Sequence, residues 1–543
     1  MAESKTVEAE CIPFASIPHT MPLFLDYLHH FDKVSRFYAR SPLTTDWHAD
    51  HLKSIDYPRE RREAVAVVLE RQNCEFGAGQ KTLKNIQRLR EGAPVVVTGQ
   101  QVTLLGGPAF CILKALTAIL QAEQAGAVPV FWLATEDHDV EEVSSVNLPA
   151  SNQRPDHPQK FSVNVPHKEG APVGGIAFGE EIAAVVQQMR ASFGSSEALD
   201  MLAECYRPGE TFGTAFARFY ARLFADFGII LLNPSDPELH GIAQPMYCQS
   251  LAQWKQINEA LLNRNRELET AGYHAQVKVT PSHTLCFYLQ DGVRTPVRHG
   301  ADGFWIGERK LAMNDDELVA EAERCPERFS ANVLLRPIIQ DFLLPTLCYV
   351  GGPSEIAYFA QVAVVYEKLL GRATPVIPRI SATLVEPRQA KLLDRYQLTL
   401  QDIFHGPEKL GELLASKALP ASTHKSFDEA AEHLERALEL VQEPLKKLDP
   451  TLLDAAQNAA SKMRHQLQGL RDKAARAEAR KNTETQHHAE ELSALLYPNK
   501  GLQERQIGGA YFLLKYGTKV LEMLQASVSL GCPDHQIVRI QVS

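Results

Sequence analysis

Short, wholly apolar runs, each followed by a glycine-containing or acidic segment, constrain the fold of this chain most strongly. Residues 94–97 are a proline and three valines, residues 109–125 form an apolar stretch of helical length, and residues 128–133 repeat the short run. A strand, a connecting helix and a second strand within about forty residues form a βαβ unit with a right-handed crossover. Similar runs at residues 228–232 and 347–350 extend the sheet, because wholly apolar strands are typical of buried parallel sheets. The sequence therefore predicts an α/β fold with a doubly wound sheet.

The chain is long enough for more than one structural unit. It has 543 residues, and at roughly 100 to 200 residues per domain this length predicts two or three units. After Ser426, apolar residues recur three or four positions apart in two charge-rich segments separated by Asp449-Pro450. This spacing predicts an antiparallel helical hairpin or coiled coil, whose alanine-rich second segment suits close packing within the hairpin or a dimer contact. We expect a core at residues 1–383 with inserts near 150–225 and 272–320, an α-helical coiled-coil domain at 384–496, and a segment at 497–543 that returns to the core.

Composition excludes several classes of protein. The net charge of -10, from 56 basic and 66 acidic residues, gives no general attraction to nucleic acid or to an anionic membrane. Nine scattered cysteines without a CxxC pair argue against a zinc ribbon and a disulfide framework, and favour a reducing cytoplasm. Neither a signal peptide nor a run of 18 apolar residues is present, so we expect no secretion and no membrane span.

The first candidate site lies between the strand at residues 94–97 and the following helix, and includes Thr98, Gly99, Gln100 and Gln101. Backbone N–H groups at a helix start attract anions, and glutamine amides donate and accept hydrogen bonds without adding charge. The pattern matches neither a P-loop nor a dinucleotide fingerprint. A glycine-rich turn also forms without a ligand, and Lys114 either reaches a phosphate or lies on the surface.

The second candidate follows the strand at residues 128–133 and contains Glu136, Asp137, His138 and Asp139. Polar residues at the carboxyl end of a buried strand are typical of a ligand site. A carboxylate beside an imidazole favours the protonated ring and orients it for acid–base catalysis, and the same residues suit a magnesium ion. The alternative is that Glu136 and Asp137 only cap the next helix.

A third junction, Gly351-Gly352-Pro353-Ser354-Glu355, again follows an apolar strand and precedes a helix. Three such junctions converge on one crevice in an open α/β sheet, where ligands of these folds bind. Glu355 has a plainer interpretation as a first-turn carboxylate that stabilises the helix dipole. His274 lies in an insert, and residues 497–505 suit either a nucleotide or a loop that docks the coiled coil onto the core.

Six ordered motifs resemble the BshC family, which is assigned to the cysteine-adding step of bacillithiol biosynthesis. They are TGQQVTLLGGPAF, PVFWLATEDHDVEEV, GYHAQ, LPTLCYVGGPSEIAYFAQ, PVIPR and YPNKGLQER. The resemblance implies a Rossmann-like core related to HIGH-type nucleotidylyltransferases and class I aminoacyl-tRNA synthetases, with connecting inserts. It also implies a coiled-coil domain through which two copies form a homodimer.

The reaction that this resemblance implies joins the carboxyl group of L-cysteine to the glucosamine amine of glucosaminyl malate. ATP is expected to activate the carboxyl group, by analogy as an acyl-adenylate. His138 would polarise an oxygen or accept the amine proton, with Asp137 or Asp139 orienting it and Glu136 beside it. The residues that would bind substrate are Thr98, Gly99, Gln100, Gln101, Gly351, Gly352, Glu355 and His274.

The resemblance also implies a second nucleotide site, for ATP or ADP, formed by Asn499, Gln503, Glu504, Arg505 and Tyr511. The chain departs from the HIGH pattern, because residues 98–101 stand where that superfamily has histidines, and no KMSKS-like lysine loop is evident. Two alternatives to a ligase therefore remain open. One is a nucleotidyltransferase or hydrolase of the same fold, and the other is a non-catalytic coiled-coil scaffold.

Overall fold

The computed structural model describes residues 10–44, 46–149, 158–300, 303–307, 313–417, 421–481 and 483–541. It divides into two compact units. The first comprises Met1–Asn152, Gln159–Thr383 and Glu504–Val538, and the second comprises Gln153–Pro158, Leu384–Gln503 and Arg539–Ser543. Residues 150–157 of the first predicted insert and residues 301–302 and 308–312 of the second lie outside the described residues.

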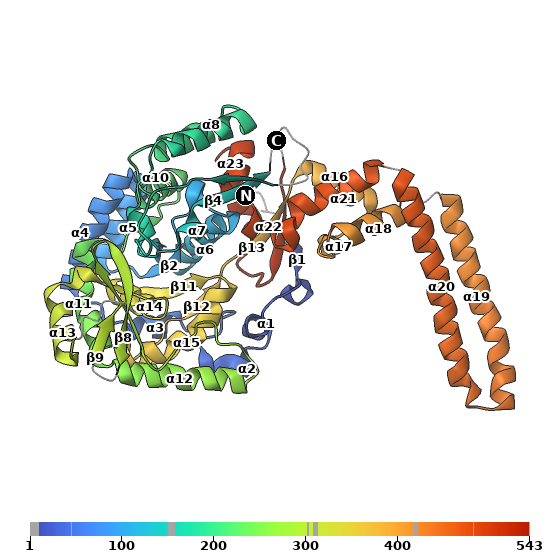
Figure 1. Ribbon diagram of the computed structural model, residues 1–543, viewed down its shortest axis with the longest axis horizontal. Coiled ribbons are helices and arrows are strands. Elements are labelled where there is room, and N and C mark those ends of the chain that lie inside the picture. Colours follow the sequence, from blue (N-terminus) through green and yellow to red (C-terminus); the bar gives the residue numbers. More distant parts are fainter. Residues whose placement is uncertain are drawn as a thin grey trace, which may run out of the picture. The chain divides into compact units, whose positions relative to one another are not determined.

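A five-stranded parallel sheet forms the centre of the first unit (Figure 1). Its strands, in spatial order, are β12 (Val376–Pro378), β11 (Thr346–Gly351), β2 (Val95–Gln100), β3 (Val128–Leu133) and β6 (Ile230–Leu232). Four of these strands coincide with the apolar runs, so the predicted α/β class is confirmed. The run at residues 376–378 is too short to stand out as a strand, although it forms the edge beside β11.

Helices pack against this sheet and connect its strands along the chain. The connecting helices are α6 (Ala109–Ala125) and α15 (Pro353–Leu370), and the chain reaches β2 through α1 (Pro22–His29), α2 (Phe31–Val34), α3 (His48–Lys53), α4 (Arg59–Phe76) and α5 (Gln80–Glu91). Helix α6 contacts β2, β3 and β11 and is buried along most of its length. It ends at Gly126, whose φ of 66° is the left-handed conformation that glycine adopts at little cost.

The two inserts add smaller sheets and helices to the first unit. The first contains the ladder of β4 (Ser145–Pro149) and β5 (Pro158–Ser162), followed by α8 (Glu181–Phe193), α9 (Glu197–Cys205) and α10 (Phe212–Leu223). After α11 (Pro237–Ala252) and α12 (Trp254–Thr270), an antiparallel sheet has the order β10 (Phe329–Ala331), β7 (His283–Gln290), β8 (Val293–Gly300), β9 (Gly303–Ile306). Helices α13 (Asp315–Arg324) and α14 (Arg336–Leu343) precede β11.

A three-stranded sheet brings together segments from both ends of the chain. Its order is β1 (Glu10–Ile12), β14 (His535–Arg539) and β13 (Ser381–Val385). Before β14 the chain forms α22 (Gln503–Gln506), α23 (Gly509–Tyr516) and α24 (Val520–Ser527). A disulfide joins Cys11 to Cys532, 521 positions apart. The scattered cysteines argue against a disulfide framework, yet this one pair meets because β1 and β14 are neighbours.

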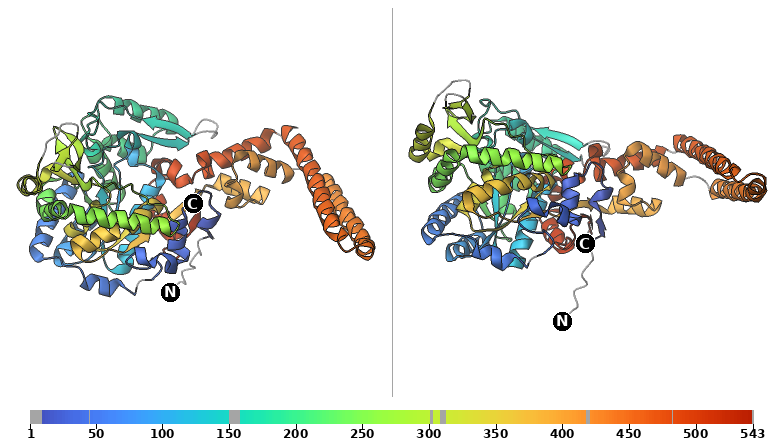
Figure 2. Two further views of the ribbon diagram at one scale, coloured as in Figure 1. Left: turned by 60° about the horizontal axis from the view of Figure 1, so that its bottom comes forward. Right: turned by 90° about the horizontal axis from the view of Figure 1, so that it is seen from below.

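The second unit is helical and confirms the predicted coiled coil. Its helices are α16 (Pro387–Tyr396), α17 (Leu400–Ile403), α18 (Pro407–Lys417), α19 (Ala421–Leu448), α20 (Leu452–Lys481) and α21 (Thr483–Leu496). Helices α19 and α20 lie side by side (Figures 1 and 2). Arg464 pairs with Glu435 at 2.6 Å and Arg471 with Asp428 at 3.0 Å, so the two helices are antiparallel. In the part of the chain that the structure describes, no helix combines the length and the apolar character needed to cross a membrane.

Candidate functional site

A cavity of about 510 Å³ opens at the carboxyl ends of β2, β3 and β11 in the first unit. Nine of the predicted site residues line it, and they come from all three junctions and from the C-terminal segment: Gly99, Gln100, Gln101, Glu136, Asp137, His138, Gly352, Glu355 and Arg505. The convergence expected for an open parallel sheet therefore occurs. Thr98, Asp139, Gly351, His274, Asn499, Gln503, Glu504 and Tyr511 do not line this cavity.

Lys114 of α6 fixes the junction after β2. Its side chain is 1% exposed, and its Nζ donates to the carbonyl oxygen of Gly99 at 2.5 Å and to Gln100 Oε1 at 3.2 Å. A third bond joins Nζ to Glu355 Oε2 at 2.6 Å. Burial lowers the pKa of this lysine, while the Glu355 carboxylate opposes that effect. Because an ammonium group has three donors and all three are used, Lys114 is neither a surface residue nor a free phosphate ligand.

Glu355 is the centre of a small buried network at the start of α15. Its Oε2 also accepts from the backbone N of Gly352 at 2.7 Å, and its Oε1 accepts from the Tyr349 hydroxyl at 2.5 Å. Burial raises the pKa of this carboxyl, but the Lys114 ammonium and the hydrogen bonds outweigh it and hold the pKa below its ordinary value. Glu355 is thus a first-turn carboxylate of α15, as its plainer interpretation expects, and it also lines the cavity.

Close packing explains two other residues after β2. A Cβ atom on Gly99 would lie 2.9 Å from the carbonyl oxygen of Trp132, so only glycine lets β2 and β3 approach at this point. The Thr98 hydroxyl donates to the carbonyl oxygen of Val350 at 3.0 Å and is buried. Thr98 therefore joins β2 to β11 beneath the cavity floor.

The two glutamines connect β2 to the acidic loop after β3. Gln101 Nε2 donates to Glu142 Oε2 at 3.0 Å and to Asp137 Oδ2 at 3.3 Å, and Gln100 Nε2 donates to Gln101 Oε1. Burial, together with the charges of Asp137 and Asp139, raises the pKa of Glu142. Neutral amides thus hold several carboxylates close together without adding a cation.

His138 is held by Arg294, a residue of the second insert. Arg294 Nη1 lies 3.2 Å from His138 Nδ1, while its Nε donates to Ser330 Oγ at 2.9 Å. The guanidinium stacks 3.8 Å from the centre of the Phe287 ring, which limits its movement. Because a guanidinium has no acceptor, Nδ1 must be the acceptor and the ring proton lies on Nε2. The same nitrogen lies 3.8 Å from Asp137 Oδ1, so Arg294 and one of the flanking carboxylates both approach this side of the ring.

Glu136 and Asp139 have distinct partners. Glu136 Oε1 lies 3.2 Å from Nε2 of His240, a buried residue of α11. Burial lowers the pKa of His240, but its bond to Glu136 outweighs this and raises the pKa above the ordinary value. Asp139 caps α7 (Val140–Val143) by accepting from the backbone N of Glu142 at 3.0 Å. The capping carboxylate is therefore Asp139 and not Glu136 or Asp137.

Three arginines that line the cavity are missing from the predicted residues. Besides Arg294, these are Arg336, whose Nη2 donates to the Tyr358 hydroxyl at 3.0 Å, and Arg379. With Lys114 and Arg505 the lining has five cations, against the four carboxylates of Glu136, Asp137, Glu142 and Glu355. Arg336 comes from α14 and Arg379 follows β12, so no local motif links them; only Arg379 belongs to a quoted motif, PVIPR.

The residues predicted for a second nucleotide site are distributed over the two units. In the first unit, Glu504 accepts from Arg379 Nη2 at 2.6 Å, from Ser381 Oγ at 2.8 Å and from the backbone N of Ala382 at 2.9 Å. Tyr511 accepts from Lys515 Nζ at 3.0 Å. In the second unit, Gln503 bonds to both backbone groups of Leu384, and Asn499 has a φ of 52°. A nucleotide here stays a prediction.

Arg379 and Arg505 give the cavity a basic end. Their guanidinium carbons lie 5.3 Å and 5.9 Å from the centre of the Phe110 ring. Burial and the neighbouring Arg379 lower the pKa of Arg505. Ser354, in the first turn of α15, lines the same cavity. Glu504 balances one of these two charges, and the net positive charge that remains beside a helix start favours an anion such as a phosphate or a carboxylate.

The described residues contain no group of three or more His, Cys, Asp or Glu side chains arranged to hold a metal ion. In the cavity, Glu136 is engaged by His240, Asp137 and Glu142 by Gln101, and Glu355 by Lys114. A magnesium ion at these carboxylates stays a prediction.

Family models and curated relatives match nearly the full length of the chain. The N-terminal Rossmann-like domain of the bacillithiol biosynthesis family BshC matches residues 7–380, and its C-terminal coiled-coil domain matches residues 382–540. A protein of Koribacter versatilis named "Putative cysteine ligase BshC" is 45% identical over 98% of this chain and 99% of its own length. Proteins of the same name from Solibacter usitatus and Salinibacter ruber are 36% and 32% identical, each over 97% of this chain, and over 99% and 98% of their own lengths. The chain therefore belongs to the BshC family.

Proposed function

We propose that this protein is an ATP-dependent ligase that joins L-cysteine to the glucosamine amine of glucosaminyl malate. The observation that carries the proposal is the cavity itself, where a basic end, the imidazole of His138 and the carboxylates of Glu136 and Asp137 meet at the carboxyl edge of the sheet. The names of the relatives specify a cysteine ligase, and a carboxylate and an amine do not condense usefully in water without activation. ATP supplies that activation in our proposal, through an acyl-adenylate.

The side chains have complementary tasks in this reaction. Arg379 and Arg505 bind anionic oxygens of a phosphate or carboxylate, in place of the histidines that the HIGH pattern has at residues 98–101. His138 donates from Nε2 to an oxygen that gains negative charge, because Nδ1 is occupied by Arg294. Glu136 or Asp137 accepts the proton that the attacking amine loses. Each of these groups faces the same cavity.

Purified protein with ATP, L-cysteine and glucosaminyl malate tests the proposal. We expect an amide product by mass spectrometry, and AMP rather than ADP as the nucleotide product. His138→Ala should abolish product formation, whereas His274→Ala, which removes an imidazole outside the cavity, should retain it. Absence of product and of cysteine-dependent AMP or ADP refutes the ligase. Nucleotide turnover without cysteine favours the nucleotidyltransferase or hydrolase, and unchanged thiol production in cells that carry a folded His138→Ala protein favours the scaffold.

We propose further that the protein is a cytoplasmic homodimer that forms through the coiled coil. Leu440, Leu448 and Leu470 are 77%, 82% and 57% exposed on α19 and α20, and covering such side chains favours association. The cytoplasm supplies the ATP and L-cysteine that the reaction consumes. Light scattering should give a dimer for the wild type and a monomer for Leu440→Glu/Leu470→Glu, whereas a monomeric wild type refutes this assembly.

A further inference from the structure

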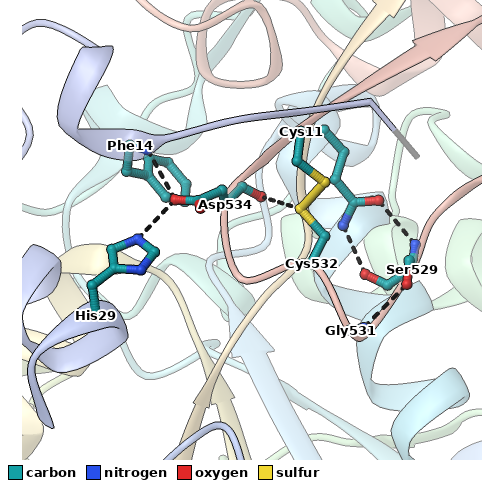
Figure 3. The surroundings of a disulfide bond; sticks show 8 residues. Cys11, Phe14, His29, Ser529, Gly531, Cys532 and Asp534 are labelled. Atoms are coloured by element: carbon teal, nitrogen blue, oxygen red, sulfur yellow. Dashed lines mark hydrogen bonds and ion pairs between the residues drawn. A yellow bond between two sulfur atoms is a disulfide. The ribbon is translucent and has the colours of Figure 1, made fainter. Parts of the chain in front are cut away.

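The disulfide between Cys11 and Cys532 lies where the two ends of the first unit meet (Figure 3). Cys11 is exposed on β1, and Cys532 is half-buried in the loop that leads into β14. We infer that this pair is a thiol–disulfide exchange site for low-molecular-weight thiols, and that its state controls the segment that carries Arg379 into the cavity. The proposed function bears on this inference only in that it makes the reaction product one such thiol.

Contacts on both sides of the disulfide hold the two cysteines together. Gln536 lies opposite Cys11 in the β1–β14 register, and its side chain bonds to both backbone groups of Ser529, at 2.9 and 2.8 Å. Asp534 Oδ1 accepts from the backbone N of Phe14 and from His29 Nε2, both at 2.9 Å (Figure 3). These bonds do not depend on the sulfur–sulfur bond. They therefore keep the reduced thiols at a high effective concentration, so that opening of the disulfide is reversible.

Small thiols exchange with the Cys11–Cys532 pair because Cys11 is exposed, whereas several other cysteines are buried. A small thiolate reaches Cys11 from solvent, because the residue is exposed. Burial raises the pKa of Cys111 and Cys286 to about 12 and that of Cys205 to about 11, so these thiols remain protonated and unreactive. Cys74 is exposed but takes part in no disulfide, and it serves as a matched control.

The loop that contains Cys532 borders the same small cavity as the segment that carries Arg379. Cys532 and Ser529 line a small cavity of about 50 Å³ together with residues 377–380. Arg379 lines both this cavity and the 510 Å³ cavity. The following strand adds a second connection, because His535 bonds to Ser381 Oγ at 2.8 Å. Loss of the disulfide therefore loosens this loop at Cys532 and weakens its support of the residues that place Arg379, while the bonds of Gln536 and Asp534 keep the loop close to β1.

The exchange balances without a further reactant. An incoming thiolate attacks one sulfur of the pair; the sulfur–sulfur bond breaks, a mixed disulfide forms and the other cysteine leaves as a thiolate that takes a proton from water. A second thiol resolves the mixed disulfide, giving the protein dithiol and the disulfide of the small thiol. The reverse steps consume that small disulfide. Accumulated thiol thus opens the Cys11–Cys532 disulfide, loosens the loop that contains Cys532 and weakens anion binding at Arg379.

Defined mixtures of L-cysteine and cystine test the exchange in the full-length protein. After alkylation, peptide mass spectrometry should show the Cys11–Cys532 disulfide replaced by mixed disulfide and dithiol as the proportion of L-cysteine rises. Cys532→Ser should retain a mixed disulfide at Cys11 alone, and Cys74→Ser should behave as the wild type. A pair that stays fully reduced, or fully oxidised, in every mixture overturns the inference.

Hydrogen–deuterium exchange then tests the coupling to the cavity. We expect residues 376–383 to lose protection in the reduced wild type and in Cys532→Ser, with no such loss in Cys74→Ser. Unchanged protection after reduction overturns the control of Arg379. The reduced wild type keeps this test valid if Cys532→Ser fails to fold. Neither readout measures ligation, so failure of the ligase proposal leaves both interpretable.

Discussion

Replacement of His535 by glutamine should alter the pH dependence of stability in a defined direction. The imidazole is fully buried, with Nδ1 2.8 Å from Ser381 Oγ and Nε2 2.8 Å from Thr383 Oγ1. Burial lowers its pKa from 6.5 to about 4. Below pH 6.5 the imidazole is protonated in the unfolded chain, whereas in the folded protein it stays neutral until about pH 4. Stability from this residue is therefore complete above pH 6.5 and declines as the pH falls toward 4.

The magnitude follows from the difference between the two pKa values. One pKa unit corresponds to about 1.4 kcal/mol, so the full loss is about 3 kcal/mol, of which about 2 kcal/mol falls between pH 7 and pH 5. Between pH 7 and pH 5, the free energy of unfolding of His535→Gln should therefore fall by about 2 kcal/mol less than that of the wild type. Burial also lowers the pKa of His51 to about 4; this residue contributes equally to wild type and variant.

Urea unfolding followed by tryptophan fluorescence measures this effect, because all four tryptophans lie in the first unit. His30→Gln removes an exposed imidazole from the same unit, and this variant should follow the wild-type pH dependence. Any constant loss of stability in His535→Gln does not matter, since the difference between pH 7 and pH 5 is the measured quantity. If the free energy of unfolding changes equally between pH 7 and pH 5 in wild type and His535→Gln, the inference of a neutral buried imidazole is refuted.

Three further outcomes follow from the contacts around the cavity. Glu504→Gln should lower the free energy of unfolding by about 3 kcal/mol, because Arg379 would remain buried without a counter-charge. The control Glu238→Gln, which removes an exposed ion pair, should lower the free energy of unfolding by about 0.5 kcal/mol or less. Lys114→Met should cost about 3 kcal/mol or more in the same urea assay, and a change as small as that of Glu238→Gln contradicts the buried ion pair. Arg294→Lys should reduce the ligase rate by about 10²-fold and alter its pH–rate profile, whereas a wild-type profile contradicts the role of Arg294 in holding His138.

The central sheet could be predicted because each buried strand is a short apolar run that contrasts with its neighbours. The residues at 128–133, for example, are followed at once by the polar loop that contains His138. Local sequence therefore places that loop at the carboxyl edge, and the structure brings the three junctions to one cavity. The coiled coil is equally direct, because its spacing of apolar residues is a local property.

The cationic half of the site could not be predicted in the same way. Arg294 reaches the cavity from an insert, and Arg336 comes from a helix that precedes β11. Their proximity depends on tertiary packing, and a single arginine has no distinctive spacing in a sequence. The Cys11–Cys532 disulfide is a similar case, since 521 positions separate its cysteines and only the pairing of β1 with β14 brings them together.

Residues 497–505 show how one polar pattern can have two interpretations that only structure separates. A buried glutamine and glutamate next to an arginine suit a ligand, but Gln503 binds the backbone of Leu384, and Glu504 binds Arg379 and Ser381. Each of these contacts satisfies a polar group that would otherwise be costly to bury. The segment thus supports Arg379 whether or not a nucleotide binds nearby.

Three separate interactions act on the same short segment after β12. Glu504 pairs with Arg379, His535 bonds to Ser381, and Cys532 lines a small cavity together with residues 377–380. Because they share one segment, perturbations of charge, protonation and disulfide state should not be additive in their effect on it. Reduction of the disulfide should therefore destabilise His535→Gln less than it destabilises the wild type, since in that variant part of the same support is already missing. Equal losses in the two proteins would show that the disulfide and His535 act on separate parts of the unit.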